Sequence, residues 1–149
     1  MSIEELSGEE RSRYARHLML PEVGQAGQQR LKAASVLCVG AGGLGSPLLL
    51  YLAAAGVGRI GIVDGDVVEL SNLQRQVIHG MDWLGQSKGR SAAHRLQELN
   101  PLCQVELHEQ MLDRENALEL ISAYDLVCDG SDQFPTREVV NDDCGVRRA

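Results

Sequence analysis

A glycine-rich turn between an apolar run and a helix-like segment restricts the fold of this chain more than any other feature. Residues 36–39 are Val-Leu-Cys-Val and residues 40–45 are Gly-Ala-Gly-Gly-Leu-Gly. A GxGxxG pattern that follows a strand and opens a helix is typical of nucleotide-binding folds. Glycines allow the backbone to approach an anion, and the N–H groups and dipole at a helix start favour negative charge. We therefore expect nucleotide contacts from Gly40, Gly42, Gly43 and Gly45.

Apolar runs of strand length alternate with helix-like segments along the rest of the chain. This alternation predicts an α/β, Rossmann-like fold with a doubly wound, mostly parallel sheet. We expect residues 1–34 to form an N-terminal helical segment and residues 35–149 a nucleotide-binding domain. The expected strands are 36–39, 59–63, 104–108 and 125–128. The expected helices are 7–17, 25–32, 45–55, 88–99 and 113–123, with Ser7 and Asp113 as N-caps, and a last helix near Phe134.

An aspartate ends the second expected strand, about 20 residues after the glycine turn. At this place Asp64 can accept the hydroxyls of a ribose, as it would in an NAD enzyme. Asn72, Arg75 and Lys88 follow it, and an NAD site does not require them. Cationic and polar groups here suit a polyphosphate, because transfer at the α-phosphorus places charge on the leaving pyrophosphate.

Five motifs in this order resemble the MoeB/ThiF branch of the ubiquitin-activating superfamily: VGAGGLG, VDGD, SNLQRQ, GQSK and DGSDQ. The segment RYARHLMLPEVGQAGQQRL resembles the N-terminal part of that family as well. The resemblance implies that ATP is bound by the glycines, Asp64, Ser71, Asn72, Leu73, Gln74, Arg75, Lys88, Asp132 and Gln133. It also implies that Asp132 holds Mg²⁺. Gln133 stands where the family usually has asparagine.

The resemblance further implies an adenylyltransferase reaction. ATP with Mg²⁺ would react with the C-terminal carboxylate of a ubiquitin-like sulfur-carrier protein ending in Gly-Gly, giving an acyl-adenylate and pyrophosphate for sulfur transfer in molybdopterin or thiamine biosynthesis. Arg75, Lys88, Asp132 and Arg16 would carry the catalysis, with Arg16 reaching the site of a neighbouring subunit in a homodimer. The family normally continues for roughly a hundred residues more, with two CxxC pairs for structural zinc that are absent here, so we expect a truncated form.

Composition excludes several classes of protein. A net charge of −7 over 149 residues argues against a nucleic-acid surface, and the apolar stretches are too short to span a membrane, so a cytoplasmic location is expected. The four cysteines lack CxxC spacing. We expect Cys38 and Cys128 in the core, Cys103 in a loop and no reactive role for Cys144. The four histidines, at positions 17, 79, 94 and 108, are expected to have surface or structural roles.

Two other functions are compatible with the sequence. An NAD-dependent oxidoreductase would use the glycine turn and Asp64, but would leave SNLQRQ and Lys88 without a purpose. A non-catalytic, truncated nucleotide-binding remnant would keep the motifs without turnover.

Overall fold

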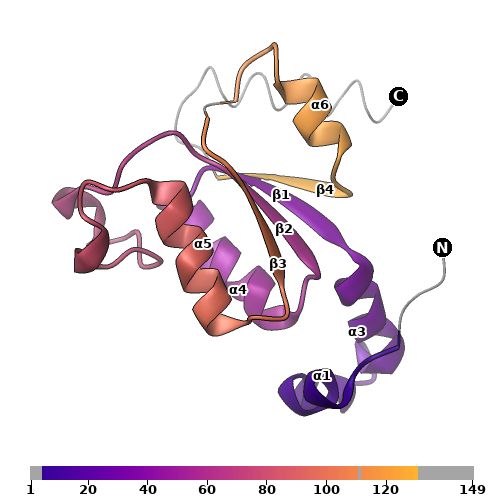
Figure 1. Cartoon of the computed structure of the whole chain (residues 1–149). Coiled ribbons are helices and arrows are strands. Elements are labelled where there is room, and N and C mark those ends of the chain that lie inside the picture. The colour runs from indigo at the N-terminus through magenta and orange to yellow at the C-terminus, as the bar shows by residue number, and fades with distance from the viewer. Residues whose placement is uncertain (1–4, 111, 131–149) are drawn as a thin grey trace.

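Four parallel strands form the centre of the molecule. The computed structural model describes residues 5–110 and 112–130, and Figure 1 shows the sheet with helices on both faces. The strands are β1 (Ser35–Val39), β2 (Arg59–Val63), β3 (Gln104–His108) and β4 (Leu126–Asp129), in the order β3-β2-β1-β4. All neighbouring pairs are parallel. The doubly wound α/β fold predicted from the sequence is therefore confirmed.

Among the described residues, helices cover the two faces of the sheet unequally. Helices α4 (Gly45–Ala55) and α5 (Lys88–Leu99) lie on one face, and the short α6 (Ala117–Ser122) lies on the other (Figure 1). Side chains of a strand alternate between faces, so Val36 and Cys38 of β1 join one core cluster while Leu37 and Val39 join the other. Strand β1, which precedes the glycine turn, is thus held between two packed layers.

The N-terminal segment is helical, but it does not form the single helix expected up to residue 17. Ser7 caps α1 (Gly8–Arg13) in a capping box with Glu10, as predicted. The helix then breaks at Tyr14, and α2 (Ala15–Leu18) and α3 (Gly24–Ala33) follow. Tyr14 is 5% exposed, and its hydroxyl accepts a hydrogen bond from Asn100 at 2.7 Å. Burial of this side chain, which the local sequence does not reveal, coincides with the break.

Helix α6 begins later than the sequence indicates. Asp113 is not its N-cap, because the Asp113 carboxylate accepts the N–H groups of Glu115 and Asn116 and closes a turn. The N-cap is Asn116, without a side-chain cap. Aspartate stabilises such a turn as readily as a helix start, and the sequence does not separate the two. The helix expected near Phe134 lies outside the described residues.

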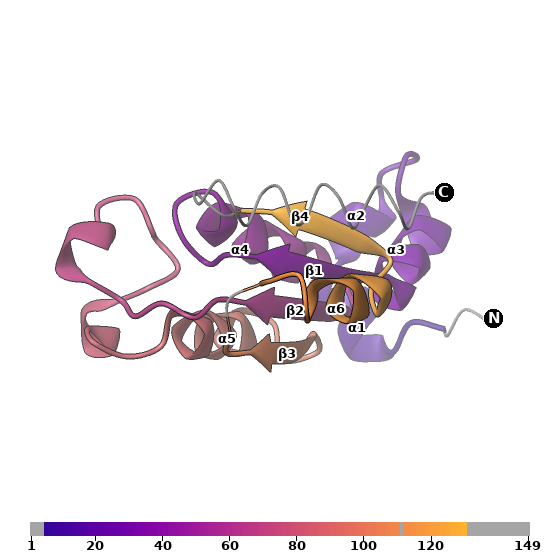
Figure 2. The same cartoon turned by 90° about the horizontal axis from the view of Figure 1, so that it is seen from above.

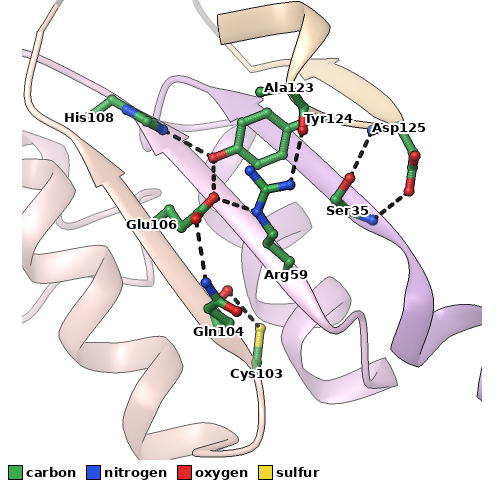
Figure 3. A network of polar contacts seen from close by, with 9 residues as sticks. All are labelled: Ser35, Arg59, Cys103, Gln104, Glu106, His108, Ala123, Tyr124 and Asp125. Atoms are coloured by element: carbon green, nitrogen blue, oxygen red, sulfur yellow. Dashed lines mark hydrogen bonds and ion pairs between the residues drawn. The ribbon is translucent and has the colours of Figure 1, made fainter. Parts of the chain in front are cut away.

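A network of polar side chains lies on the α6 face of β2 and β3 (Figure 3). Glu106 receives hydrogen bonds from Arg59 at 2.6 Å and from the Tyr124 hydroxyl at 2.7 Å. Burial opposes ionisation of Glu106, but these two bonds outweigh it and lower its pKa. The Arg59 guanidinium also lies 4.3 Å from the centre of the Tyr124 ring. These contacts tie the end of α6 to the sheet edge.

Residues 65–86 form an irregular excursion beyond the carboxyl ends of the strands (Figure 2). It contains two short 3-10 helices, η1 (Leu70–Asn72) and η2 (Met81–Trp83). Cys38 and Cys103 are buried, and burial raises the pKa of these thiols to about 12 and about 11. Cys128 is partly buried against the same core. Within the described residues, no helix has the length and apolarity needed to cross a membrane.

Candidate nucleotide-binding site

The glycine turn lies at the point in the sheet where the order of the strands reverses. It follows β1, whose two neighbours are β2 and β4, and open α/β sheets bind ligands at such switch points. Gly40 has φ +95°, a conformation that side chains disfavour. A Cβ on Gly45 would overlap the Gly40 carbonyl, and a Cβ on Gly130 would lie 2.9 Å from the Gly45 Cα. Glycine is therefore required here for backbone packing.

The turn leaves hydrogen-bond donors unused. Helix α4 has no side-chain cap, and no described group accepts the N–H groups of Gly42, Gly43 or Leu44. The dipole of α4 adds partial positive charge at the same place. A phosphate group would satisfy both features.

Asp64 is fastened to this turn by its carboxylate. Asp64 directly follows β2 and is 7% exposed. Its carboxylate oxygens accept the N–H groups of Ala41 and Asp66, each at 2.8 Å. A carboxylate has about four acceptor positions. Two positions therefore remain for the hydroxyls of a ribose.

The segment 75–79 lies along the glycine turn and contacts it at successive positions. The Arg75 Nε lies 3.7 Å from the position of a Cβ on Gly43, and its guanidinium donates a 3.3 Å hydrogen bond to the Ser71 carbonyl. The Ser46 hydroxyl accepts the N–H of Ile78 at 2.8 Å. The exposed guanidinium of Arg75 is thus placed over the turn, where phosphate is expected.

His79 has a structural role, one of the two roles expected for the histidines, and it contacts the glycine turn. Its ring joins the Ala41 carbonyl at 2.8 Å through Nε2 and the Ser91 hydroxyl at 2.7 Å through Nδ1. Since a carbonyl can only accept, Nε2 carries the proton. Burial lowers the pKa of His79 most; Lys88 lowers it further, while the Ala41 carbonyl and Asp64 raise it. The neutral ring therefore links the turn to α5, through partners too distant in sequence for a motif to indicate.

Lys88 is the first residue of α5 and is 8% exposed. Its N–H donates to the Asp66 carbonyl at 3.0 Å, which joins α5 to the loop after Asp64. No group in the described part of the chain pairs with its ammonium. A largely buried cation without a counter-ion suits an anionic ligand.

The SNLQRQ residues have mixed roles. The side-chain oxygen of Asn72 accepts the N–H of Glu69 at 3.0 Å and so closes η1. Ser71 and Gln74 are exposed, and Leu73 is partly buried. Asn72 therefore shapes the loop, and only its amide nitrogen is left for a ligand.

Arg16 is not near the turn of its own chain. It is exposed on α2, and the adjacent Tyr14 lies against Gly56, at the opposite end of α4 from the turn. Eleven helical residues separate these ends by about 16 Å. Asp132 and Gln133 lie outside the described residues, and within the described ranges no three carboxylates, histidines or cysteines gather as metal ligands.

Comparison with known proteins identifies the family of this chain. The model of the ThiF family matches residues 14–148. The chain is 60% identical over 137 residues to the probable adenylyltransferase/sulfurtransferase MoeZ of Mycobacterium tuberculosis, covering 92% of this chain and 35% of the relative. It is 58% identical over 134 residues to the sulfur carrier protein adenylyltransferase of Thermus thermophilus, covering 90% and 49%.

A solved structure of Escherichia coli tRNA N6-threonylcarbamoyladenosine dehydratase, TcdA, in complex with ATP is similar in fold. Its TM-score is 0.90 at 28% identity, over 99% of this chain and 59% of the other. The chain spans half or less of the length of the two curated relatives named above. The family model covers most of the chain. The chain therefore belongs to the ThiF family.

Proposed function

We propose that this chain provides the nucleotide site of an enzyme that transfers AMP from ATP to a protein carboxylate. One observation carries the proposal: the turn N–H groups have no acceptor among the described residues, the Arg75 guanidinium lies over the same turn, and Asp64 is bound to it. Lys88, largely buried and without a counter-ion among the described residues, begins α5 and is joined to the loop after Asp64. An NAD site would need the turn and Asp64, but not the two cations. The names of the relatives from M. tuberculosis and T. thermophilus support adenylyl transfer.

The proposed substrate is the C-terminal carboxylate of a ubiquitin-like sulfur carrier ending in Gly-Gly. This carboxylate is already ionised near neutral pH, so its attack on the α-phosphorus needs no general base. The work of the protein is then alignment and charge stabilisation. Arg75 and Lys88 stabilise the departing pyrophosphate, the turn N–H groups orient the phosphates and Asp64 holds the ribose. Molybdopterin or thiamine biosynthesis is the proposed pathway.

Mg²⁺ would be held by Asp132, and when bound it would neutralise phosphate charge. We propose a homodimer in which Arg16 of one subunit enters the other subunit's site, because Arg16 is exposed and lies far from the turn of its own chain. The division between a helical segment up to residue 34 and the nucleotide-binding domain, and a cytoplasmic location, remain predictions.

Calorimetric titration of this chain with Mg-ATP and, separately, NAD tests the proposal. We expect saturable binding of Mg-ATP and none of NAD. Arg75→Ala should weaken ATP binding about 10–100-fold, since it removes charge-assisted hydrogen bonds. The same variant should bind adenosine normally. Arg11→Ala, which removes an exposed charge on α1, is the matched control.

Each other outcome identifies a different function. Binding of NAD in place of ATP would overturn the proposal in favour of an oxidoreductase. Binding of neither nucleotide would overturn the proposal and show that the chain keeps the family's motifs without a working nucleotide site.

A further inference from the structure

Gln76 is a buried polar side chain beside the glycine turn, and the proposed reaction gives it no role. It is 2% exposed, between Arg75 and the residues that fasten the loop to the turn. Its Oε1 has no hydrogen-bond partner, and among buried side-chain nitrogen and oxygen atoms of the described residues it is alone in this. Buried polar groups are nearly always paired, so an unpaired acceptor at a ligand site requires an explanation.

The carboxamide of Gln76 lies directly against the glycine turn. Its Nε2 is 3.3 Å, and its Cδ 3.8 Å, from the position of a Cβ on Gly42. The N–H groups of Gly42 and Gly43 have no acceptor among the described residues. The atom of the carboxamide that faces Gly42 is the nitrogen Nε2, so a half-turn of the carboxamide would exchange it for the unpaired Oε1 and bring that acceptor to the unpaired donors.

The surrounding contacts hold the loop on both sides of these groups. Ile78 is bound to Ser46, and His79 is bound to Ala41, on either side of the donors. Oε1 is too buried for a ligand atom to reach it directly. The turn can reach it once a half-turn of the carboxamide places Oε1 where Nε2 now faces Gly42.

We infer that Gln76 is a positioning residue, whose Oε1 accepts an N–H of the glycine turn when a nucleotide phosphate binds there. This inference rests on the proposed function. The phosphate accepts hydrogen bonds from some N–H groups of the turn. Gln76 accepts one from an N–H group that points away from the phosphate in the bound turn. Pairing of Oε1 then favours the nucleotide-bound turn over the empty one.

The substitution Gln76→Met tests the inference, because methionine keeps the length of the side chain and removes both polar atoms. We expect the thermal midpoint without nucleotide to be unchanged or higher, and Mg-ATP binding to be about tenfold weaker. Gln28→Met is the matched control. Gln28 is fully buried too, but its oxygen meets His17 at 3.0 Å and its nitrogen donates to Ala55 at 2.9 Å. That variant should lower the midpoint and leave ATP binding unchanged.

Hydrogen exchange gives the second readout. In the wild type, Mg-ATP should slow exchange of the Gly42 and Gly43 amides, and in Gln76→Met this protection should be reduced even when ATP is saturating. Equal ATP affinity and equal protection in wild type and Gln76→Met would overturn the inference while leaving ATP binding in place. A lower midpoint with unchanged affinity would show a purely structural role and overturn it as well. Failure of the wild type to bind Mg-ATP would overturn the proposed function and this inference together.

Discussion

At the scale of single residues, the site depends on a neutral histidine. His79 joins the Ala41 carbonyl to the Ser91 hydroxyl, and burial lowers its pKa below the ordinary value of 6.5. As pH falls below about 6.5, the unfolded chain takes up a proton that the folded chain resists, so the free energy of unfolding falls. We expect this loss to begin near pH 6.5 and to level off once the pH is below the folded-state pKa. Urea unfolding at several pH values measures it.

The variant His79→Gln isolates this contribution. It should flatten the pH dependence between pH 6.5 and 5, whereas His94→Gln, on the exposed face of α5, should not. Glu10 and Glu106, whose pKa values are lowered from 4.5, add a loss of stability only at lower pH. An unchanged slope in His79→Gln would contradict the assignment of a neutral ring.

At the scale of elements, the packing of strand β2 against the chain that follows α6 depends on one glycine. A Cβ on Gly61 would overlap the ring and hydroxyl of Tyr124, which lies across the sheet. Gly61→Ala must displace Tyr124 and with it the bonds to Glu106, so we expect a loss of about 1–3 kcal/mol in the free energy of unfolding. Urea denaturation measures this loss. Gly80→Ala, where a Cβ meets nothing within 4 Å, is the control. Equal stability of the two variants would show that Tyr124 moves without cost.

Elements with local boundary signals were the ones that the sequence predicted well. Helix α4 ends at Ala55, since Gly56 follows it with φ +95°, and α5 ends before Asn100-Pro101. The break at Tyr14 coincides with burial of a side chain that bonds Asn100, 86 residues away, and no local pattern contains that contact. The site divides in the same way. The glycine turn, Asp64 and Lys88 follow from motif and strand end, while the roles of Gln76 and His79 depend on contacts with residues 30 or more positions earlier.

At the scale of the whole molecule, the separation between Arg16 and the glycine turn has a measurable consequence. If two subunits share sites, Arg16→Ala and Arg75→Ala damage the same site from opposite subunits. Each variant alone should bind Mg-ATP at least tenfold more weakly than the wild type, because each removes a charge-assisted contact to phosphate. In a mixture, a heterodimer has one site with both defects and one with neither. Random pairing should therefore restore about a quarter of the high-affinity sites.

Titration of an equimolar, re-equilibrated mixture with Mg-ATP counts those sites. A mixture of Arg75→Ala with Lys88→Ala is the matched control: both residues belong to one chain's site, the former over the turn and the latter at the start of α5. In that heterodimer each site keeps one defect, so no high-affinity site should return. Recovery with the first pair alone would place Arg16 in the partner's site. If Arg16→Ala alone bound ATP normally, Arg16 would be a surface charge on α2 without a role in binding. The site would then lie within one chain.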